Sequence, residues 1–411
     1  MAGPVIVFAG AVYPGQFGLL CDHLRASGLA ETFFFTTPGH RERNLARGDH
    51  LRSFQPDGPI VGPQGYYYSA KAERSARIGR GLLAALRDFE RERRIDVVVA
   101  HSLWGAPHFL YDEIDAAIVS YVEFPSYRAH GWDPAYPPDL AQRLADRNME
   151  MLHFHQVLKS DLTIVPSHHA KSMFPAELRG RIEVQFEGFD VAPPAPAPRP
   201  PDALPVIGFA ARDLSSAKGI DVYIRLVERL LAEGVAARFV AMGDAEAPTY
   251  GYEAQWVQRT HGGEVKSFRD HLLRLHPRAA GAIEFTGKLP YAEFAERVAQ
   301  VDLFLYPLRF GVANWGLMEI LARGGCVIAP RRGYAPELVA HDVNGWLEAD
   351  DDDAWIAAIK ALLADPPRRR RYAEAARETG RSFHVSATAP RYMRLFRHAM
   401  DLRAQRIGNA G

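Results

Sequence analysis

The sequence predicts an α/β protein made of two halves, each with its own parallel sheet. Residues 5–8 (VIVF) form a short apolar run that is followed by a glycine-bearing loop and an amphipathic segment, the order strand, loop, helix. This order restarts at residues 205–211, after the proline-rich segment 191–205, whose composition excludes a regular helix or strand. A chain of 411 residues is long enough for two domains with separate cores.

Composition excludes several functional classes. Lys plus Arg equals Asp plus Glu at 49 each, so the net charge favours neither nucleic acid nor an acidic polymer as a partner. Cys21 and Cys326 stand in apolar surroundings of different halves, so we expect no disulfide, and a reducing cytoplasm fits. No apolar run reaches the ~20 residues that span a bilayer. Residues 4–10 lack a basic leader, so we expect no signal peptide.

The first half opens with a loop that can approach a ligand. Within residues 13–16 (YPGQ), Gly15 permits close approach of the backbone, although a simple turn is the alternative, and the spacing fits neither a dinucleotide fingerprint nor a P-loop. Residues 31–37 are the next predicted strand. The segment 41–94 carries 12 Lys/Arg against 7 Asp/Glu, together with three consecutive tyrosines. Contact with an anionic membrane is one interpretation of it, but we favour a solvated helix face.

Two polar residues stand where predicted strands end. His101 follows the strand at 96–100, and Glu123 follows the strand at 117–122. Ligands bind at the carboxyl ends of parallel strands, so we favour a site role for His101 over that of a hydrogen-bonded structural histidine. For Glu123 a site role and a structural role are equally well supported.

No group of residues has the spacing of metal ligands. His153 and His155 face different sides of a helix predicted over residues 143–158, and the adjacent pair at 168–169 has no ligand spacing either. The acidic run at 350–353 precedes a predicted helix that begins near residue 354, where acids stabilise the first turn. We therefore expect no metal site.

The second half places two cations in one turn. Arg212 and Lys218 lie between the strand at 205–211 and a helix predicted over 220–233. Fixed cations beside a helix N-terminus can hold a diphosphate. Further strands are predicted at 238–243 and 283–287, separated by a less regular insertion at 244–280.

Residues 301–330 form a second strand–loop–helix–strand unit. The strand at 301–306 leads through a loop to a helix at 315–322, and residues 326–329 form the next strand. Glu319 lies near the predicted helix start, where a carboxylate can accept hydrogen bonds from a vicinal diol such as a ribose and free N–H groups attract phosphate. A solvated helix acid explains Glu319 equally well when this stretch is taken alone.

This stretch resembles the signature of the family 4 glycosyltransferases (glycosyl transferases group 1) of the GT-B fold. The first Glu of the family's E-x7-E pair falls at Gly311, a departure that affects the contact to the donor sugar and leaves the nucleotide end of the site intact. The turn from Arg212 to Gly219 and the P-G-Q-F opening also match. The remaining matching positions are Met318–Glu319, Ala322, Gly324, Val327–Ala329, Pro336–Val339, Asn344–Gly345, Gly188 and Asp190.

The resemblance implies a GT-B architecture, with two Rossmann-like α/β/α domains that face each other across a cleft. We expect an acceptor-side domain at 1–190 and a proline-rich linker at 191–204. A donor-binding domain at 205–388 and a helix at 389–411 that packs back on the first domain would follow.

The implied activity is retaining transfer of a sugar from a nucleotide-diphosphate sugar, of the UDP or GDP type, to an acceptor hydroxyl, without a cofactor. In that scheme Arg212 and Lys218 neutralise the departing diphosphate, Glu319 holds the ribose, and His101 contacts the donor sugar or polarises groups near the reaction centre. The further donor-side candidates are Gly15, Gly287, Lys288, Asn314, Trp315, Gly316 and Leu317. The acceptor-side candidates are Gln16 and Glu123.

The expected protein is a cytoplasmic, hexosyltransferase-like enzyme of bacterial polysaccharide or glycoconjugate biosynthesis. Its acceptor would be a sugar, a lipid-linked molecule or a small molecule, with peripheral contact at the inner-membrane surface left open. Two alternatives remain. GT-B folds also serve nucleotide-sugar epimerases, and the missing acid at Gly311 makes a non-catalytic binding protein conceivable.

Overall fold

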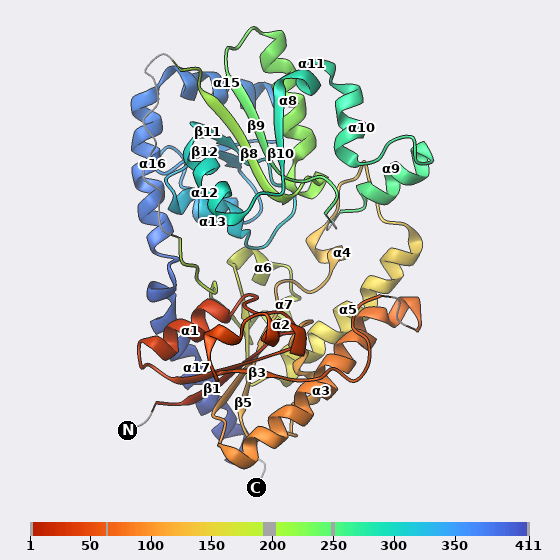
Figure 1. Cartoon of the computed structure of the whole chain (residues 1–411), viewed down its shortest axis with the longest axis vertical. Coiled ribbons are helices and arrows are strands. Elements are labelled where there is room, and N and C mark those ends of the chain that lie inside the picture. Colours follow the sequence, from red (N-terminus) through yellow and green to blue (C-terminus); the bar gives the residue numbers. More distant parts are fainter. Residues whose placement is uncertain (1–2, 63–64, 192–202, 248–250, 409–411) are drawn as a thin grey trace. The chain divides into compact units, whose positions relative to one another are not determined.

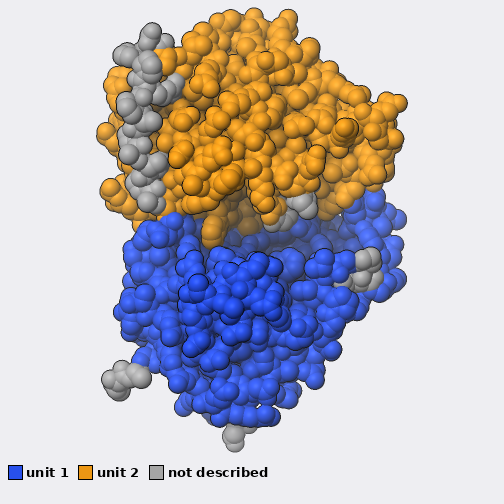
Figure 2. Space-filling model, viewed as in Figure 1, with its two compact units in different colours: residues 1–130, 139–190, 383–411 blue, residues 131–138, 191–382 orange. Residues whose placement is uncertain are grey.

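The protein forms two compact units, each with its own parallel sheet. The computed structural model describes residues 3–62, 65–191, 203–247 and 251–408. The first unit comprises Met1–His130, Asp139–Asp190 and Phe383–Gly411, and the second comprises Gly131–Pro138 and Val191–Ser382 (Figure 2). The expected α/β class with two separate sheets is confirmed. Most of the predicted linker, residues 192–202, lies outside the described residues.

The first unit has a seven-stranded sheet in the order β3-β2-β1-β4-β5-β6-β7, and every pairing is parallel. Phe8 on β1, an interior strand, pairs with Phe34 on one side and Val99 on the other. Both faces of the sheet are covered, which explains why the strands are apolar throughout. The strands are β1 (Val5–Ala9), β2 (Glu31–Thr36), β3 (Leu51–Ser53), β4 (Val97–His101), β5 (Ala117–Tyr121), β6 (Leu162–Val165) and β7 (Ile182–Val184).

Helices cover both faces of this sheet (Figure 1). Leu20 of α1 and Phe396 of α17 pack in one core cluster, whereas Ile78 and Leu82 of α3 pack in the other. The helices are α1 (Gly18–Ala26), α2 (Pro38–Glu42), α3 (Ala70–Glu92), α4 (Tyr127–His130), α5 (Leu140–Lys159), α6 (His168–Ser172), α7 (Ala176–Arg179) and α17 (Val385–Gly408). Short 3-10 turns are η1 (Leu45–Arg47), η2 (Tyr67–Ser69) and η3 (Pro107–Phe109).

The second unit has a six-stranded parallel sheet in the order β10-β9-β8-β11-β12-β13. The strands are β8 (Val206–Asp213), β9 (Arg238–Asp244), β10 (Ile283–Gly287), β11 (Leu303–Leu305), β12 (Val327–Pro330) and β13 (Trp346–Glu348). The helices are α8 (Ile220–Ala232), α9 (Glu253–His261), α10 (Phe268–Leu275), α11 (Pro277–Ala282), α12 (Tyr291–Ala299), α13 (Trp315–Ala322), α14 (Ala335–Leu338), α15 (Asp352–Ala364) and α16 (Pro366–Arg381), with a 3-10 turn η4 (Ser216–Lys218).

Residues 383–388, which the sequence-based division put in the second domain, cluster with the first unit. Here the backbone of Phe189 exchanges hydrogen bonds with Phe383 and Val385, at 3.1 and 2.9 Å. Helix α17 accordingly begins at Val385, four residues before the helix predicted at 389–411, and Pro390 lies inside it. Segment 131–138 likewise belongs to the second unit, which the sequence did not indicate.

The insertion at 244–280 is more regular than expected, because α9, α10 and most of α11 lie in it. These helices have 9, 8 and 6 residues, too short to produce a clear periodic pattern in the sequence. The acidic run does start a helix as predicted: the Asp351 side chain accepts a hydrogen bond from the Ala354 backbone at 2.8 Å. Across the described ranges, no helix combines the length and the apolar character that crossing a membrane requires.

Candidate active site

The order of the strands indicates one position in each sheet where a ligand is expected to bind. In the first unit the chain winds outward from β1 to β3 and then continues from β4 on the other side, so the order reverses between β1 and β4. In the second unit it reverses in the same way between β8 and β11. Ligands bind beyond the carboxyl ends of the strands at such a switch point. The loops after these four strands carry most of the residues that the sequence singled out.

In the second unit, Arg212 lies near the end of β8, and Lys218 lies at the end of η4, which follows this strand. The Arg212 side chain is 62% exposed and its Nη2 lies 3.4 Å from Asp213 Oδ1, whereas Lys218 is half-buried. Gly219 ends the turn with a φ of +83°, and a Cβ there would lie 2.1 Å from the Pro307 carbonyl oxygen. Only glycine fits this position, where the loop after β11 meets the start of α8.

Arg309 fixes this turn from one side. Its guanidinium donates to both carboxylate oxygens of Asp221, at 2.5 and 2.6 Å, and to the Ser216 carbonyl oxygen at 3.0 Å. The Arg309 backbone N–H donates to the Ala217 carbonyl oxygen at 3.0 Å. Asp133, in segment 131–138, lies 3.5 Å from the same guanidinium. Arg309 thereby connects the turn to α8 and to a segment distant in sequence.

Glu253 supports the turn from α9. It is fully buried, and its Oε2 accepts a hydrogen bond from the Ser216 hydroxyl at 3.2 Å. Burial raises the pKa of Glu253, and the negative charge of Asp213 acts in the same direction. Asp213 is also fully buried, and within the described part of the chain nothing hydrogen-bonds to its Oδ2. Two buried carboxyl groups therefore lie in this region, Asp213 beside Arg212 and Glu253 beside Ser216.

Helix α13 has the predicted bounds, and Glu319 is its fifth residue, in the second turn. Arg323, one turn later, donates from Nε and Nη2 to Glu319 Oε1, at 3.1 and 2.9 Å. Arg323 is almost fully buried, and its Nη2 also donates to the Tyr291 hydroxyl at 3.1 Å. Glu319 is thus an internal ion-pair partner of a buried arginine as well as a candidate ribose ligand.

The first residues of α13 lie where the sequence predicted them. Asn314 caps the helix, and its side-chain oxygen accepts a hydrogen bond from the Gly316 backbone N–H at 3.0 Å. Trp315 is 37% exposed, but the Leu317 side chain is fully buried, so only the backbone of Leu317 can reach a ligand. A Cβ at Gly311 would lie 2.9 Å from Leu308 Cδ2, so an acid at this position would need Leu308 to move.

Gly287 and Lys288 stand at the far edge of the same sheet. Gly287 ends β10 with a φ of +68°, and Lys288 follows it with an exposed side chain. Because β10 is the edge strand, three strands away from β11 in the sheet order, the fold does not place these two residues at the switch point.

In the first unit, His101 and Glu123 lie together with Gln16. His101 is the last residue of β4, and its Nδ1 accepts hydrogen bonds from the backbone N–H groups of Leu103 and Trp104, at 3.2 and 3.4 Å. The proton of the neutral ring is therefore on Nε2, which lies 3.8 Å from Glu123 Oε1. Gln16 Nε2 donates to the same carboxylate oxygen at 3.1 Å.

These contacts favour an ionised Glu123. Burial acts to raise the pKa of Glu123, but the contact with His101 and the hydrogen bond from Gln16 outweigh it and lower the pKa below the usual value. The Glu123 side chain is 33% exposed, whereas that of His101 is 6% exposed. A carboxylate acceptor next to an Nε2–H donor suits a hydroxyl group that needs both.

His153 holds the segment that follows Glu123. Its Nδ1 lies 2.9 Å from the Pro125 carbonyl oxygen, and burial lowers the pKa of His153 to about 4, so the ring stays neutral and donates this bond. Gly15 has a φ of +49° in the loop after β1, where a Cβ would lie 2.9 Å from the Val12 carbonyl oxygen. This glycine therefore serves a tight turn.

The predicted residues divide between the units. Arg212, Lys218 and Glu319 belong to the second unit, with the other candidates of that half, and His101 belongs to the first with Gly15, Gln16 and Glu123. The sequence indicated His153 only as a possible metal ligand. It did not single out the other residues that support the site, because no local pattern indicates this role: Asp133, Asp213, Asp221, Glu253 and Arg309. Over the described ranges, no three His, Cys, Asp or Glu side chains form a group that could hold a metal ion.

Comparisons with known proteins match both halves of the chain. Residues 30–193 match the family described as "Glycosyl transferase family 4 group", and residues 196–379 match "Glycosyl transferases group 1". Over 237 residues the chain is 30% identical to a GDP-mannose-dependent alpha-mannosyltransferase of Mycolicibacterium smegmatis, covering 55% of this chain and 54% of that protein. A D-inositol 3-phosphate glycosyltransferase of Xylanimonas cellulosilytica is 29% identical over 204 residues, covering 49% and 44%. The chain thus spans about half the length of these relatives.

Solved structures share the whole fold. Sucrose-phosphate synthase from Thermosynechococcus elongatus has a TM-score of 0.71 at 16% identity, covering 96% of this chain and 98% of that one. HepE from Anabaena, solved in complex with UDP and glucose, has a TM-score of 0.63 at 16% identity, covering 95% and 99%. With one family matched in each half and the GT-B fold along the full length, the chain belongs to the group 1, family 4 glycosyltransferases.

Proposed function

We propose that this protein transfers a sugar from a nucleotide-diphosphate sugar to an acceptor hydroxyl, with retention at the anomeric carbon. The observation that carries the proposal is the turn from Arg212 to Lys218, which presents two cations at the switch point of the second sheet. Arg309 and Glu253 hold its backbone and one of its hydroxyls. A turn fixed in advance can stabilise charge that grows on a departing diphosphate without reorganising.

The other candidates have roles on either side of this reaction. Glu319 would bind the ribose hydroxyls, and Asn314, Trp315 and Gly316 would line the nucleotide site. His101 would donate from Nε2 to the donor sugar, and Glu123 with Gln16 would receive the acceptor hydroxyl. Arg212 and Lys218 would supply the positive charge that other transferases take from a metal ion, so the reaction needs no metal.

The relatives support a UDP or GDP donor and a bacterial setting. One is named GDP-mannose-dependent, and a structural neighbour was solved with UDP and glucose. We place the reaction in the synthesis of a bacterial polysaccharide or glycoconjugate, on the cytoplasmic side of the membrane. The acceptor would be a sugar, a lipid-linked molecule or a small molecule.

The first test is a thermal-shift screen against UDP, GDP, ADP and TDP. A nucleotide at a hundred times its dissociation constant adds about 2.7 kcal/mol to the free energy of unfolding of the state that binds it. We expect one of UDP and GDP to raise the melting temperature clearly more than the others. Lys218→Ala should reduce this shift, whereas Lys360→Ala, which removes an exposed lysine paired with Glu233, should leave it unchanged.

The second test is product analysis with the sugar form of the best nucleotide. A transferase releases nucleotide only when an acceptor is present and gives a product with the donor's anomeric configuration. Free epimerised sugar without an acceptor would instead identify an epimerase. Nucleotide binding without turnover across a panel of sugar and lipid-linked acceptors would contradict the transferase proposal.

A further inference from the structure

Helix α5 carries an exposed apolar stripe along its whole length. Leu140, Leu144, Met151 and Leu158 are 61%, 47%, 65% and 50% exposed. At 3.6 residues per turn, the four positions lie within about 40° of one another around the helix axis. Single exposed apolar residues are ordinary on soluble proteins, but a contiguous stripe marks a surface that binds something apolar.

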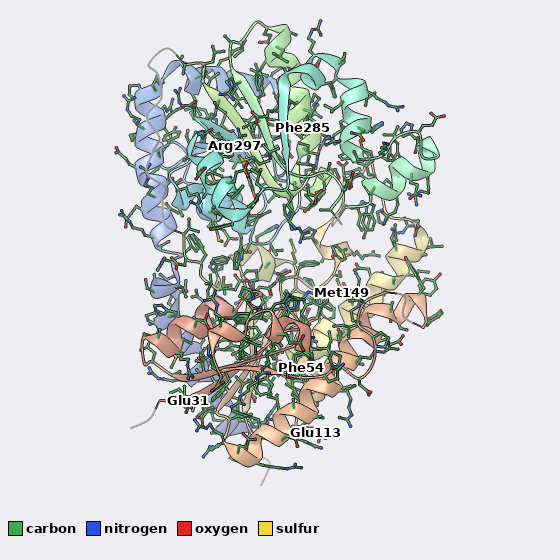
Figure 3. All side chains as sticks on the ribbon, in the orientation of Figure 1. Glu31, Phe54, Glu113, Met149, Phe285 and Arg297 are labelled. Atoms are coloured by element: carbon green, nitrogen blue, oxygen red, sulfur yellow. The ribbon has the colours of Figure 1, made fainter. Side chains whose placement is uncertain are left out.

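This stripe is not the core-facing side of the helix. The opposite side packs into the first unit through Met149, His153 and Val157, which are all buried. Figure 3 labels Met149 on this helix, and Lys71 Nζ lies 3.7 Å from its sulfur. Because α5 is apolar on two opposite sides, the exposed leucines are additional to what the fold requires.

Basic side chains flank the stripe on both sides. By the same helical geometry, Arg147 stands between Leu144 and Met151, about 20° from Leu140, and Arg143 lies about 60° away on the same side. Lys159 lies about 100° away on the other side, with the neutral His155 between it and the stripe, and all four side chains are exposed. Throughout α5, which is described from end to end, no acidic side chain lies in the stripe.

The acidic side chains on and next to α5 make hydrogen bonds away from the stripe. Asp146 is buried and accepts hydrogen bonds from the Tyr127 and Arg128 backbone, at 3.0 and 2.7 Å. Glu150 is 21% exposed and accepts hydrogen bonds from Ser126 and Arg147. Asp139 caps the start of the helix, so the outward face stays apolar and positive.

Exposed aromatic rings adjoin the helix. Helix α5 packs against η2 and η3, and Asn148 Nδ2 donates to the Tyr68 carbonyl oxygen at 2.6 Å. On and beside these turns, Tyr66, Tyr67 and Phe109 are 64%, 55% and 38% exposed. Helix α3 also packs against α5 in this unit (Figure 1). Exposed aromatic rings thus lie on the turns that pack against α5.

We propose that this face of α5 binds the surface of an anionic lipid bilayer. Leu140, Leu144, Met151 and Leu158 would enter the boundary between headgroups and acyl chains, while the flanking cations contact lipid phosphates. The tyrosines beside α5 would lie at headgroup level, where rings with an apolar body and a polar tip are favoured. This inference is independent of the proposed sugar transfer and assigns a surface that the reaction does not use.

A second copy of the chain fits this face less well. In a two-fold interface the same face meets itself, so each stripe would face the other with positive side chains along both borders. Like charges placed opposite each other at an interface are unfavourable. An anionic bilayer both accommodates the apolar side chains of the stripe and attracts the basic side chains beside it.

The test is co-sedimentation of the full chain with vesicles. We expect binding to vesicles of equal parts phosphatidylcholine and phosphatidylglycerol, weaker binding at high salt, and little binding to phosphatidylcholine alone. Leu144→Gln/Met151→Gln should lower the partition coefficient at least tenfold. Arg143→Gln/Arg147→Gln should lower it about 30-fold on the anionic vesicles, from the usual contribution of each cation near such a surface.

The matched control is Leu275→Gln/Ile407→Gln, which removes two apolar side chains that are 60% and 51% exposed on other helices. Its binding should equal that of the wild type. Circular dichroism must show that all variants are folded. Equal loss in the control and the α5 variants would overturn the proposal, as would failure of the wild type to bind anionic vesicles. A dimer in light scattering that Leu144→Gln/Met151→Gln dissociates, without an effect on vesicle binding, would assign the face to a second copy instead.

Discussion

The guanidinium group of Arg309 lies 2.5 and 2.6 Å from the two carboxylate oxygens of Asp221, in a two-pronged ion pair. Their side chains are 19% and 10% exposed, so water screens the pair only weakly. The same guanidinium donates to the Ser216 carbonyl oxygen inside the turn that carries Lys218. The pair therefore positions the backbone on which the proposed diphosphate site depends.

Arg309→Lys should destabilise the second unit and weaken the site together. A lysine cannot reproduce the paired donors, and losing hydrogen bonds to a charged partner costs about 2 kcal/mol. In a domain of this size that corresponds to a fall in melting temperature of roughly 4–8 °C. The control is Arg229→Lys, one of whose partners, Asp353, is 83% exposed, so water screens the pair and the melting temperature should barely change. Equal effects of the two variants would contradict the role given to Arg309.

Glu253→Gln should stabilise the protein at neutral pH. The pKa of Glu253 is raised in the folded state by burial, so the folded state binds its proton more tightly than the unfolded state does. Stability therefore falls as pH rises from the ordinary glutamate value through the raised pKa. A glutamine keeps an acceptor for the Ser216 hydroxyl and carries no charge, so we expect a gain of about 1 kcal/mol, or roughly 2–4 °C, at pH 8.

Melting curves from pH 4 to pH 8 measure this effect. The difference between Glu253→Gln and the wild type should be small at the acidic end and grow toward pH 8. Glu246→Gln, in an exposed position of the same connection, is the control and should follow the wild type at every pH. A difference that shrinks as the pH rises would show that Glu253 is stabilised as the anion.

The strands and the main helices could be predicted because strands that are buried on both faces appear in the sequence as short, continuous apolar runs. Runs such as 96–100 are apolar, and the paired halves follow from the restart at 205. Helix α5 was predicted from residue 143, but it begins at Leu140 because Asp139 and Gln142 form reciprocal caps, at 2.8 and 2.9 Å. Its exposed leucines could not be predicted, because a helix with apolar residues on two opposite sides has a weak 3.6-residue hydrophobic periodicity.

The supporting residues of the site could not be predicted for a different reason. Arg309 and Asp221 are 88 positions apart, and Glu253 and Ser216 are 37 apart, so only the folded chain brings each pair together. Nothing in the local sequence around Asp133 indicates that segment 131–138 joins the second unit. Glu319 was predicted as a ligand for ribose, but its pairing with Arg323 at i+4 was visible in the sequence and was overlooked.

Glu123→Gln should impair use of the acceptor without weakening binding of the nucleotide. Glu123 is held as an anion by His101 and Gln16, and in the proposed reaction it receives the acceptor hydroxyl. We expect kcat/KM for the acceptor to fall by about tenfold or more, while the nucleotide thermal shift stays unchanged. Glu150→Gln, which changes a partly buried carboxylate of the same unit, is the control. A fall in nucleotide affinity with normal acceptor kinetics would move Glu123 to the donor side.

Lys218→Ala and Glu319→Gln should differ in which kinetic constant they change. Negative charge on the diphosphate grows as the bond to the sugar breaks, so removing Lys218 should lower kcat by about a hundredfold, equivalent to ~3 kcal/mol. In the proposed reaction Glu319 holds the ribose equally before and during bond breaking, so Glu319→Gln should mainly raise the KM for the donor.

The ion pair between Glu319 and Arg323 demands a further control in that experiment. Glu319→Gln also leaves the Arg323 guanidinium, whose side chain is 4% exposed, without its carboxylate. Arg323→Gln breaks the same pair but retains Glu319, so it should lower the melting temperature while leaving the donor KM closer to the wild-type value. If Arg323→Gln raised the KM as much as Glu319→Gln, Glu319 would act through the structure of α13. If Glu319 contacts the ribose directly, Glu319→Gln and Arg323→Gln should lower the melting temperature by similar amounts, but only Glu319→Gln should strongly raise the donor KM.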